Sequence, residues 1–207
     1  MPTVWEAEEE FKREVLDVNA EFAEGYVKLY KDIGYDGVIG IGPNPVTEFN
    51  EERIEPEIGD NFDIGEFARI VCDVRIGSGA DIGQRAAIRA DEGAPIIIGK
   101  NAEIEDRVTF HALKGTSVEV GNGLDAGNDA VLHGPLKVGD NLTTDDNAVV
   151  FRADVGDDVT VGKDAIIQGP ASEDDPNDLE LKIPDGTNIP QGAVVTSEED
   201  LQELEDE

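Results

Sequence analysis

The chain has 207 residues, and its 16 Lys and Arg against 48 Asp and Glu leave a formal net charge of −32. This length predicts about one domain, and so acidic a surface is repelled by nucleic-acid phosphates and anionic lipids, which disfavours both as partners. Because 39% of the residues are apolar, many of them Ile and Val, the composition indicates a folded chain.

The distribution of the acids predicts the surroundings of the protein. They are spread from end to end, as in proteins kept soluble where concentrated salt screens self-repulsion. A single cysteine, Cys72, excludes an intramolecular disulfide, and neither a secretory signal nor a run of ~18 apolar residues is present. We therefore expect a cytoplasmic protein of a salt-accumulating, halophilic organism.

The first predicted element is an amphipathic helix over residues 4–33. Thr3 and Glu6 form a capping-box pattern at its start, and Gly34 can end it. Asp17 and Asn19 could divide it into two helices. Its apolar residues fall at steps of three and four: Phe11, Val15, Val18, Phe22, Tyr26, Leu29 and Ile33. With the Gly- and Pro-rich connector that follows, this helix makes residues 1–43 a segment expected to pack on the main domain.

A six-residue repeat dominates residues 58–169. Such a period is typical of a left-handed parallel β-helix, in which three hexads form one coil, and it predicts a mainly β fold of about six coils. The repeat has insertions after Ile88 and Phe110 and one deletion before Val155. The aliphatic positions are Ile58, Ile64, Ile70, Ile76, Ile82, Ile88, Ile98, Ile104, Phe110, Val120, Ala126, Leu132, Val138, Thr144, Val150, Val155, Val161 and Ile167.

The end of the chain reads differently. Residues 171–183 are predicted to be an acidic loop, and residues 198–207 an acidic tail that forms at most a short capped helix. The β-helix domain is expected to span residues 44–197. Cys72 follows a core position by two residues and is expected to be buried.

The two histidines occupy equivalent positions of successive coils. His111 follows Phe110 and His133 follows Leu132, so both should point outward about 4.7–4.9 Å apart. Two imidazoles at this spacing can bind one metal ion. The alternative is a subunit interface in which they only form hydrogen bonds. The same outward column continues with Arg89, Phe151 and Gln168.

A third ligand is sought on the neighbouring face. Asp106 and Asn128 share a register position there, and Asn128 is nearer in level to His133. An amide oxygen is a weaker zinc ligand than imidazole. Asp129 or Asp125 could take its place after a small rotation.

Several motifs resemble the gamma-class carbonic anhydrases. They are RADEG from Arg89, HAL from His111, HGP from His133, NPVT at 44–47, NAVVF at 147–151 and IPDGTNIPQGAVVTS at 183–197. The resemblance covers residues 44–197. It implies a left-handed β-helix homotrimer whose metal ion lies at each subunit interface, bound by two histidines of one chain and a third from its neighbour.

The resemblance also assigns the metal ligands. His111 and His133 correspond to the two histidines of one chain, and Asn128 stands where the family has its third histidine. Glu103 and Glu105 replace an amide pair, and Lys114 stands where some members carry a proton-shuttle glutamate.

Other family residues match one by one. Glu92 stands in place of the catalytic glutamate, Arg89 and Asp91 in place of an ion pair between subunits, and Asp106 in place of an acid that contacts the ligand shell.

The expected function is reversible hydration of CO2 to bicarbonate, dependent on zinc, with iron or cobalt as alternatives. The loss of the third histidine predicts weak activity. One alternative is a catalytically silent trimeric scaffold. Another is a hexapeptide-repeat acyltransferase that uses His111 or His133 as a general base with a coenzyme A donor.

Overall fold

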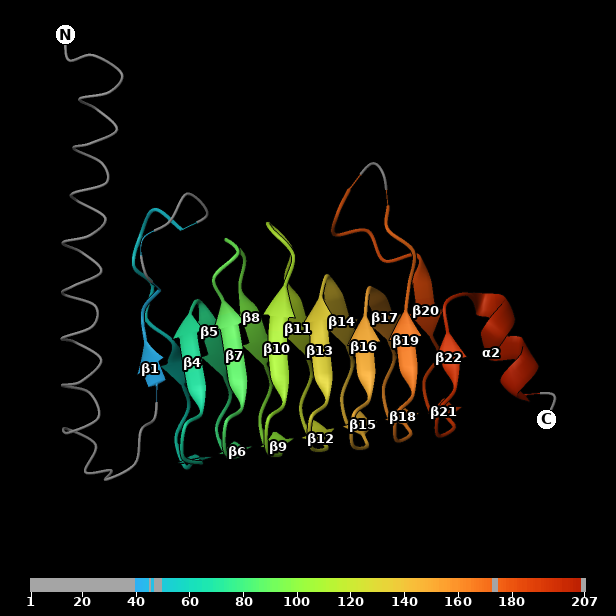
Figure 1. The fold of residues 1–207 in the computed structure, drawn as a ribbon, viewed down its shortest axis with the longest axis horizontal. Helices are drawn as coiled ribbons and strands as arrows, with labels where there is room; N and C mark the ends of the chain where they lie inside the picture. The colour runs from blue at the N-terminus through green and yellow to red at the C-terminus, as the bar shows by residue number, and fades with distance from the viewer. Residues whose placement is uncertain (1–39, 45, 47–49, 173–174, 206–207) are drawn as a thin grey trace, which may run out of the picture.

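The computed structural model describes residues 40–44, 46, 50–172 and 175–205. In this part of the chain, short strands follow one another around a three-sided coil, and the coils stack into a solenoid that ends in one helix (Figure 1). The helix predicted over residues 4–33 lies outside the described residues. The predicted left-handed β-helix class is confirmed.

Sheet A is the face that carries the histidines, and all its strand pairs are parallel. Within the described residues its strands, in spatial order, are β1 (Gly40–Gly42), β4 (Arg69–Cys72), β7 (Ala87–Ala90), β10 (Thr109–Ala112), β13 (Val131–Gly134), β16 (Val149–Phe151), β19 (Ile166–Gln168) and β22 (Val194–Val195).

Sheets B and C form the other two faces and are also parallel. In the described part of the chain, sheet B contains β2 (Glu57–Ile58), β5 (Val74–Ile76), β8 (Ile96–Ile98), β11 (Val118–Val120), β14 (Leu136–Val138), β17 (Ala153–Val155) and β20 (Leu181–Ile183). Sheet C contains β3 (Asp63–Ile64), β6 (Asp81–Ile82), β9 (Glu103–Ile104), β12 (Asp125–Ala126), β15 (Thr143–Thr144), β18 (Thr160–Val161) and β21 (Asn188–Ile189).

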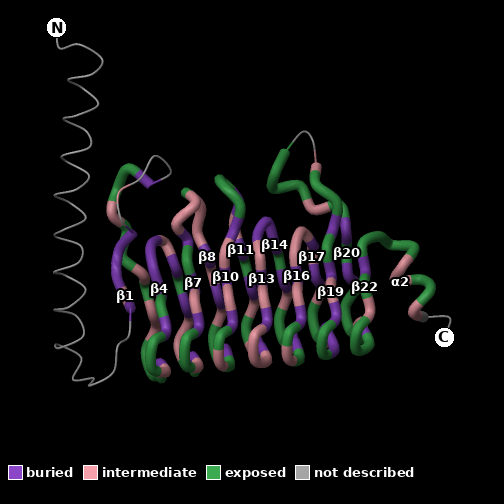
Figure 2. The backbone as a smooth tube through the Cα atoms, in the orientation of Figure 1, coloured by how far each residue is buried: buried purple, intermediate pink, exposed green. Residues whose placement is uncertain are grey.

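The six-residue period fills the interior of the solenoid. Each predicted position from Ile64 to Ile167 is buried, and Figure 2 shows this buried lining recurring from coil to coil. Phe110, for example, pairs with Ile88 in one direction and Leu132 in the other, and all three are fully buried. Aliphatic residues stacked in this way exclude water from the whole axis, so repetition of the coil provides the core.

The solenoid is longer than the repeat over residues 58–169 predicted. Six coils lie in that range, as expected, but Ile41 of β1 pairs with Ile70 ahead of them. Beyond them Ile183, Ile189 and Val195 are buried at the same spacing of six. The predicted loop over 171–183 was therefore wrong at β20. The acidic insertion before Leu181 hides the return of the period, because its composition resembles that of a loop.

The corners that lead from sheet C into sheet A use left-handed backbone. Arg107 and Asp129 have φ of 62° and 61° and occupy equivalent corners one coil apart. Non-glycine residues adopt this conformation at some cost, which is smaller for Asn and Asp than for other types. Arg107 Nε and Nη2 each lie 2.7 Å from a carboxylate oxygen of Asp129, so a bidentate ion pair ties these two corners together.

The predicted short helix at the end of the chain is confirmed as α2 (Glu198–Glu205). Its capping box joins Ser197 and Asp200, since Asp200 N donates to Ser197 Oγ at 3.3 Å and Ser197 N donates to Asp200 Oδ2 at 3.0 Å. Leu201 and Leu204 pack against the end of the core. The described part of the chain holds no helix long and apolar enough to cross a membrane.

Cys72 is fully buried at the end of β4, as predicted. Burial raises the pKa of its thiol, which keeps it protonated and unreactive. Its Sγ lies 3.8 Å from Oδ1 of Asn50, a side chain from the segment between β1 and β2. Cys72 therefore serves the packing between this segment and the first coils.

Candidate metal centre

The histidines lie side by side on the outer face of sheet A. His111 on β10 pairs directly with His133 on β13, as the register predicted, and their ring centroids are 5.3 Å apart. His111 Nδ1 lies 3.4 Å from His133 Nε2. Both residues are of intermediate exposure, and the side chain of His111 keeps 24% of its area accessible. The pair is therefore outside the core and accessible to a ligand.

The tautomer of His133 follows from its hydrogen bond. Its Nδ1 lies 2.8 Å from the carbonyl oxygen of Gly134, and a carbonyl only accepts, so the hydrogen is on Nδ1 and the lone pair on Nε2. Burial lowers the pKa of His133 below its ordinary value of 6.5. A neutral imidazole whose second nitrogen donates to a carbonyl has the form typical of metal-binding histidines.

The tautomer of His111 follows from Asp91. His111 Nε2 lies 3.2 Å from Asp91 Oδ1 and 3.4 Å from Arg89 Nη2. A carboxylate only accepts and a guanidinium only donates, so the shorter contact, to Asp91, assigns the hydrogen to Nε2. The bond from His111 is the main cause that lowers the pKa of Asp91. In its neutral form, His111 then has its lone pair on Nδ1, the atom that faces His133.

These two assignments decide whether the pair fits a metal ion. Two lone pairs face each other across 3.4 Å, an arrangement that is repulsive unless a cation lies between them. Two nitrogens bound to one tetrahedral zinc at about 2.0–2.1 Å are about 3.3 Å apart. The donor atoms, their protonation and their spacing thus fit two ligands of one metal ion.

The loop after β7 supplies the groups around His111. Arg89 Nη2 lies 3.4 Å from His111 Nε2 and 3.2 Å from Asp91 Oδ2, and Glu92 Oε1 lies 4.0 Å from the same histidine nitrogen. Asn50 Nδ2 donates to the carbonyl oxygen of Asp91 at 2.5 Å. Arg89 and Asp91 thus form an ion pair within this chain, and the ion pair between subunits stays a prediction.

Asn128 lies at the opposite edge of the same sheet. It is on the corner between β12 and β13, before the strand begins, whereas His133 is near the end of β13. Figure 1 shows β13 running from this corner to its arrowhead. Val131 to His133 alone spans about 7 Å at about 3.3 Å per residue. Asn128 lies beyond that span, and its side-chain contacts are with Glu105 and Asp146 rather than with the histidines.

The other predicted third ligands are also outside the histidine pair. Asp129 is held by Arg107 on both carboxylate oxygens, and Asp125 is an exposed residue of β12 in sheet C. Asp106 accepts a hydrogen bond from Gln84 N at 2.7 Å and lies at the corner one coil before Asn128. Within the described residues, no group of three His, Cys, Asp and Glu is arranged to hold a metal ion.

Glu105 lies next to Asn128. Asn128 Nδ2 donates to Glu105 Oε2, so the substituted amide and the substituted acid contact each other directly. The histidine pair and the Asn128 corner are thus two separate groups on one sheet.

Three residues of these groups had no assigned role in the sequence. The Phe151 ring lies 4.8 Å from the His133 ring, and Arg152 lies over Phe151 at 4.3 Å. Asp146 lies at the corner one coil after Asn128 and accepts from its backbone N at 3.2 Å. The register could have identified Asp146, because it follows Asn128 by one coil, while Arg152 stands at a corner whose side-chain direction depends on its positive φ of 53°.

Comparison with known proteins finds several relatives. The chain is 30% identical over 193 residues to a carbonic anhydrase of Methanosarcina thermophila, covering 84% of this chain and 74% of that protein. It is 32% identical over 172 residues to the carboxysome assembly protein CcmM of a Nostoc species and 28% identical over 160 residues to that of Synechococcus elongatus. Of these CcmM proteins the matched segments cover 29% and 28% of the length.

Other comparisons add little. No family model matches the chain. The solved structure of the BC4754 gene product of Bacillus cereus, described as a candidate acetyltransferase, aligns with 74% of this chain and 85% of its own, at 20% identity and a TM-score of 0.33.

Proposed function

Because this chain belongs to the gamma-class carbonic anhydrase family, we propose that it catalyses the reversible hydration of CO2 to bicarbonate at a metal centre that includes His111 and His133. The observation that carries this proposal is the pair of facing ring nitrogens at 3.4 Å, each left with a lone pair by the hydrogen bond on the other side of its ring. Zinc is the proposed metal, with iron or cobalt as alternatives. When bound, such an ion lowers the pKa of water toward ~7.

The third ligand is proposed to come from a second copy. Asn128 occupies the other edge of sheet A, so one copy must bring its Asn128 edge to the histidine edge of the next. An interface between two different edges is heterologous, and it forms a ring when the rotation between copies closes. Three copies, as the family resemblance implies, would make a homotrimer with one site at each interface. The outer face of sheet A supports this arrangement, since Val131, Val149 and Ile166 remain partly exposed.

The residues around the histidines are proposed to orient them, to accept a proton and to exclude solvent. Asp91 holds His111 in the tautomer that leaves Nδ1 free, and Arg89 holds Asp91. Glu92, half-buried and 4.0 Å from His111 Nε2, is proposed to accept the proton released from water and pass it to buffer. Phe151 covers one side of His133 and shields that ring from solvent.

Weak activity is part of the proposal. An amide oxygen at residue 128 binds zinc less well than imidazole, and Lys114 stands where some family members place an acidic proton shuttle, which leaves proton export to buffer. The test is a stopped-flow measurement of CO2 hydration on zinc-loaded protein in molar KCl, with His111→Ala as the control. A rate above buffer that a chelator and His111→Ala both abolish is expected. A rate that survives either treatment contradicts the proposal.

A catalytically silent scaffold is the second candidate. Asn128 in place of the third histidine favours it, and so does the 32% identity to a carboxysome assembly protein. Under this alternative the chain keeps the trimer and loses the chemistry. A zinc-loaded trimer without a hydration rate, in which Asn128→His restores a rate, would support the scaffold and identify the substitution that silenced it.

The location of the protein in a high-salt cytoplasm stays a prediction.

A further inference from the structure

The side chain of Asn128 is held from two sides by acids. Its Nδ2 donates to Glu105 Oε2, from the coil before, and to Asp146 Oδ1 at 3.2 Å, from the coil after. The backbone N of Asn128 donates to the same Asp146 oxygen, also at 3.2 Å. Asp146 is itself steadied by Lys163 Nζ at 3.5 Å. The amide thus sits in a stack of corners that spans several coils.

The chemistry of these partners decides which way the amide faces. Carboxylates accept hydrogen bonds and do not donate them, so the group between Glu105 and Asp146 must be the NH2 of Asn128. Both of its hydrogens are then used. Oδ1 is the remaining atom of the amide, and it is directed away from the two acids.

We propose that Glu105 and Asp146 are positioning residues that make Asn128 an oxygen ligand. By binding its NH2 on two sides, they present only Oδ1 to the histidine pair of the neighbouring copy. This inference rests on the proposed function, because it needs a metal ion shared between copies. It adds which atom of Asn128 binds and which residues of this chain orient it.

A change of metal preference follows from the oxygen ligand. Imidazole suits zinc, while carbonyl oxygens suit harder ions such as Mn2+. The wild-type site should therefore favour zinc over manganese by a smaller factor than the Asn128→His variant does.

The chain contains a matched corner that has no assigned site. Asn122 N donates to Asp140 Oδ1 at 2.6 Å and Asn122 Nδ2 donates to the same oxygen at 3.1 Å. This repeats the contacts of Asn128 with Asp146 at another corner of the same coils. Asp140→Ala therefore removes an equivalent structural contact without touching the proposed ligand, and it serves as the control.

The experiment measures Zn2+ affinity by chelator competition on the assembled full-length protein. We expect Glu105→Ala and Asp146→Ala each to lower the affinity roughly 10–100-fold, as is usual for residues that orient a ligand. Asp140→Ala should leave it within about twofold. The conservative variants Glu105→Gln and Asp146→Asn keep an acceptor oxygen and should recover most of the loss. The visible spectrum of Co2+-loaded protein should change in the alanine variants and return in the conservative ones.

A double-mutant comparison separates positioning from simple charge attraction. In an Asn128→Ala background, Glu105→Ala and Asp146→Ala should cause no further loss. An equal loss in that background, or an equal loss with Gln and Ala at residue 105, would show that the acids act through their charge and would overturn the inference.

Failure of the inference is distinguishable from failure of the proposed function. Zinc binding that His111→Ala abolishes but Asn128→Ala leaves unchanged overturns the inference and the choice of Asn128 as third ligand, and leaves the histidine centre and its proposed activity standing. Zinc binding with the expected pattern but no CO2 hydration leaves the inference standing and overturns the proposed activity. Protein that binds no zinc overturns both.

Discussion

The two edges of sheet A, one where its strands begin and one where they end, carry different kinds of proposed metal ligand. At the edge where β10 and β13 end, His111 and His133 are half-buried, and their outer ring nitrogens bind Asp91 and the carbonyl of Gly134. At the edge where β13 begins, Asn128, also of intermediate exposure, lies on a corner between Glu105 and Asp146. One edge holds two oriented nitrogen donors, and the other holds one oriented oxygen donor.

The difference shows how a repeat architecture places two of the proposed metal ligands at one end of the strands and the third at the other end. Stacking of equivalent positions brings residues of successive coils together, which pairs the histidines and pairs Asn128 with its acids. It cannot join the two edges, because β13 lies between them. Completion of the site therefore depends on the surface of a second copy, as proposed above.

Leu132→Ala should have the largest effect, because Leu132 is fully buried on β13 between the two edges. We expect it to lower the free energy of unfolding by about 2–5 kcal/mol and to weaken zinc binding. Leu142→Ala, at another fully buried leucine, should cost a similar free energy and leave zinc binding intact. Denaturant unfolding and chelator competition measure the two quantities. Equal zinc affinities in the two variants would show that β13 does not align the edges.

Asn128→His tests whether the second edge limits the site. Contacts to a ligand alone change metal affinity roughly 10–100-fold, so exchange of an oxygen ligand for imidazole should raise zinc affinity by at least about tenfold. The CO2 hydration rate should rise with it in stopped-flow traces. Asn122→His, at the matched corner, should change neither, and an equal gain there would point to a nonspecific effect of an added histidine.

Asp91→Asn tests the first edge. It removes the acceptor that fixes the His111 tautomer and should lower zinc affinity roughly tenfold. The hydrogen bond from His111 holds the pKa of Asp91 below its ordinary 3.8. A group with a lowered folded-state pKa contributes stability that is present above its unfolded pKa and is lost as the pH falls through its folded-state pKa.

In the metal-free state, the denaturant midpoint of Asp91→Asn should therefore lie below that of wild type at neutral pH. The two midpoints should converge in acid below pH 3.8. Glu203→Gln, at an exposed residue of α2 away from the site, is the control and should match wild type throughout. A difference between wild type and Asp91→Asn that persists unchanged through acid would contradict the assigned cause.

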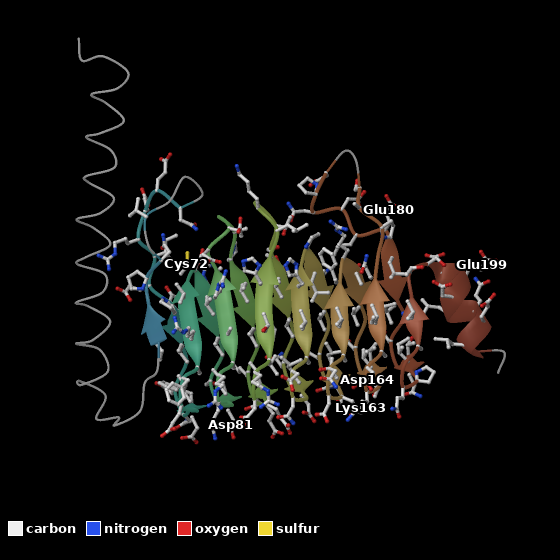
Figure 3. All side chains as sticks on the ribbon, viewed as in Figure 1. Cys72, Asp81, Lys163, Asp164, Glu180 and Glu199 are labelled. Atoms are coloured by element: carbon white, nitrogen blue, oxygen red, sulfur yellow. The ribbon has the colours of Figure 1, made fainter. Side chains whose placement is uncertain are left out.

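The smallest expected effect on stability comes from sheet C, whose strands carry neither the histidine pair nor Asn128. Four acids pair with one another in register along its outer face: Asp63, Asp81, Glu103 and Asp125. Figure 3 labels one of them, Asp81, at the bottom of the view. Like charges directly opposite each other on a sheet are destabilising, by about 0.2–1 kcal/mol. Glu103→Gln should stabilise the fold by that amount in dilute buffer and by less in molar KCl, since salt screens exposed charges.

Asp154→Asn on sheet B is the opposite case. Asp154 pairs with Lys137 and Lys182, so its loss should destabilise the fold slightly in dilute buffer. Thermal unfolding at two salt concentrations compares the variants. The same sign of effect for Glu103→Gln and Asp154→Asn would exclude cross-strand charge as the cause.

Much of the fold was predictable because one rule repeats. A single aliphatic residue every six positions predicted the coils over residues 58–169, the burial of their core and the pairing of His111 with His133. The rule failed where its period was interrupted. Ile183, Ile189 and Val195 resume it after an acidic insertion, and composition alone made that region look like a loop.

The candidate site likewise has a part that was predictable from the sequence and a part that was not. The sequence by itself determined the stacking of residues one coil apart, since a fixed strand spacing converts register into proximity. Only the tertiary structure decided that Asp91 bonds to His111 within one chain, that Arg107 occupies both oxygens of Asp129, and that Glu105 and Asp146 orient Asn128. These contacts depend on insertion loops and on corners of positive φ, where the direction of a side chain follows from backbone angles that no periodic pattern encodes.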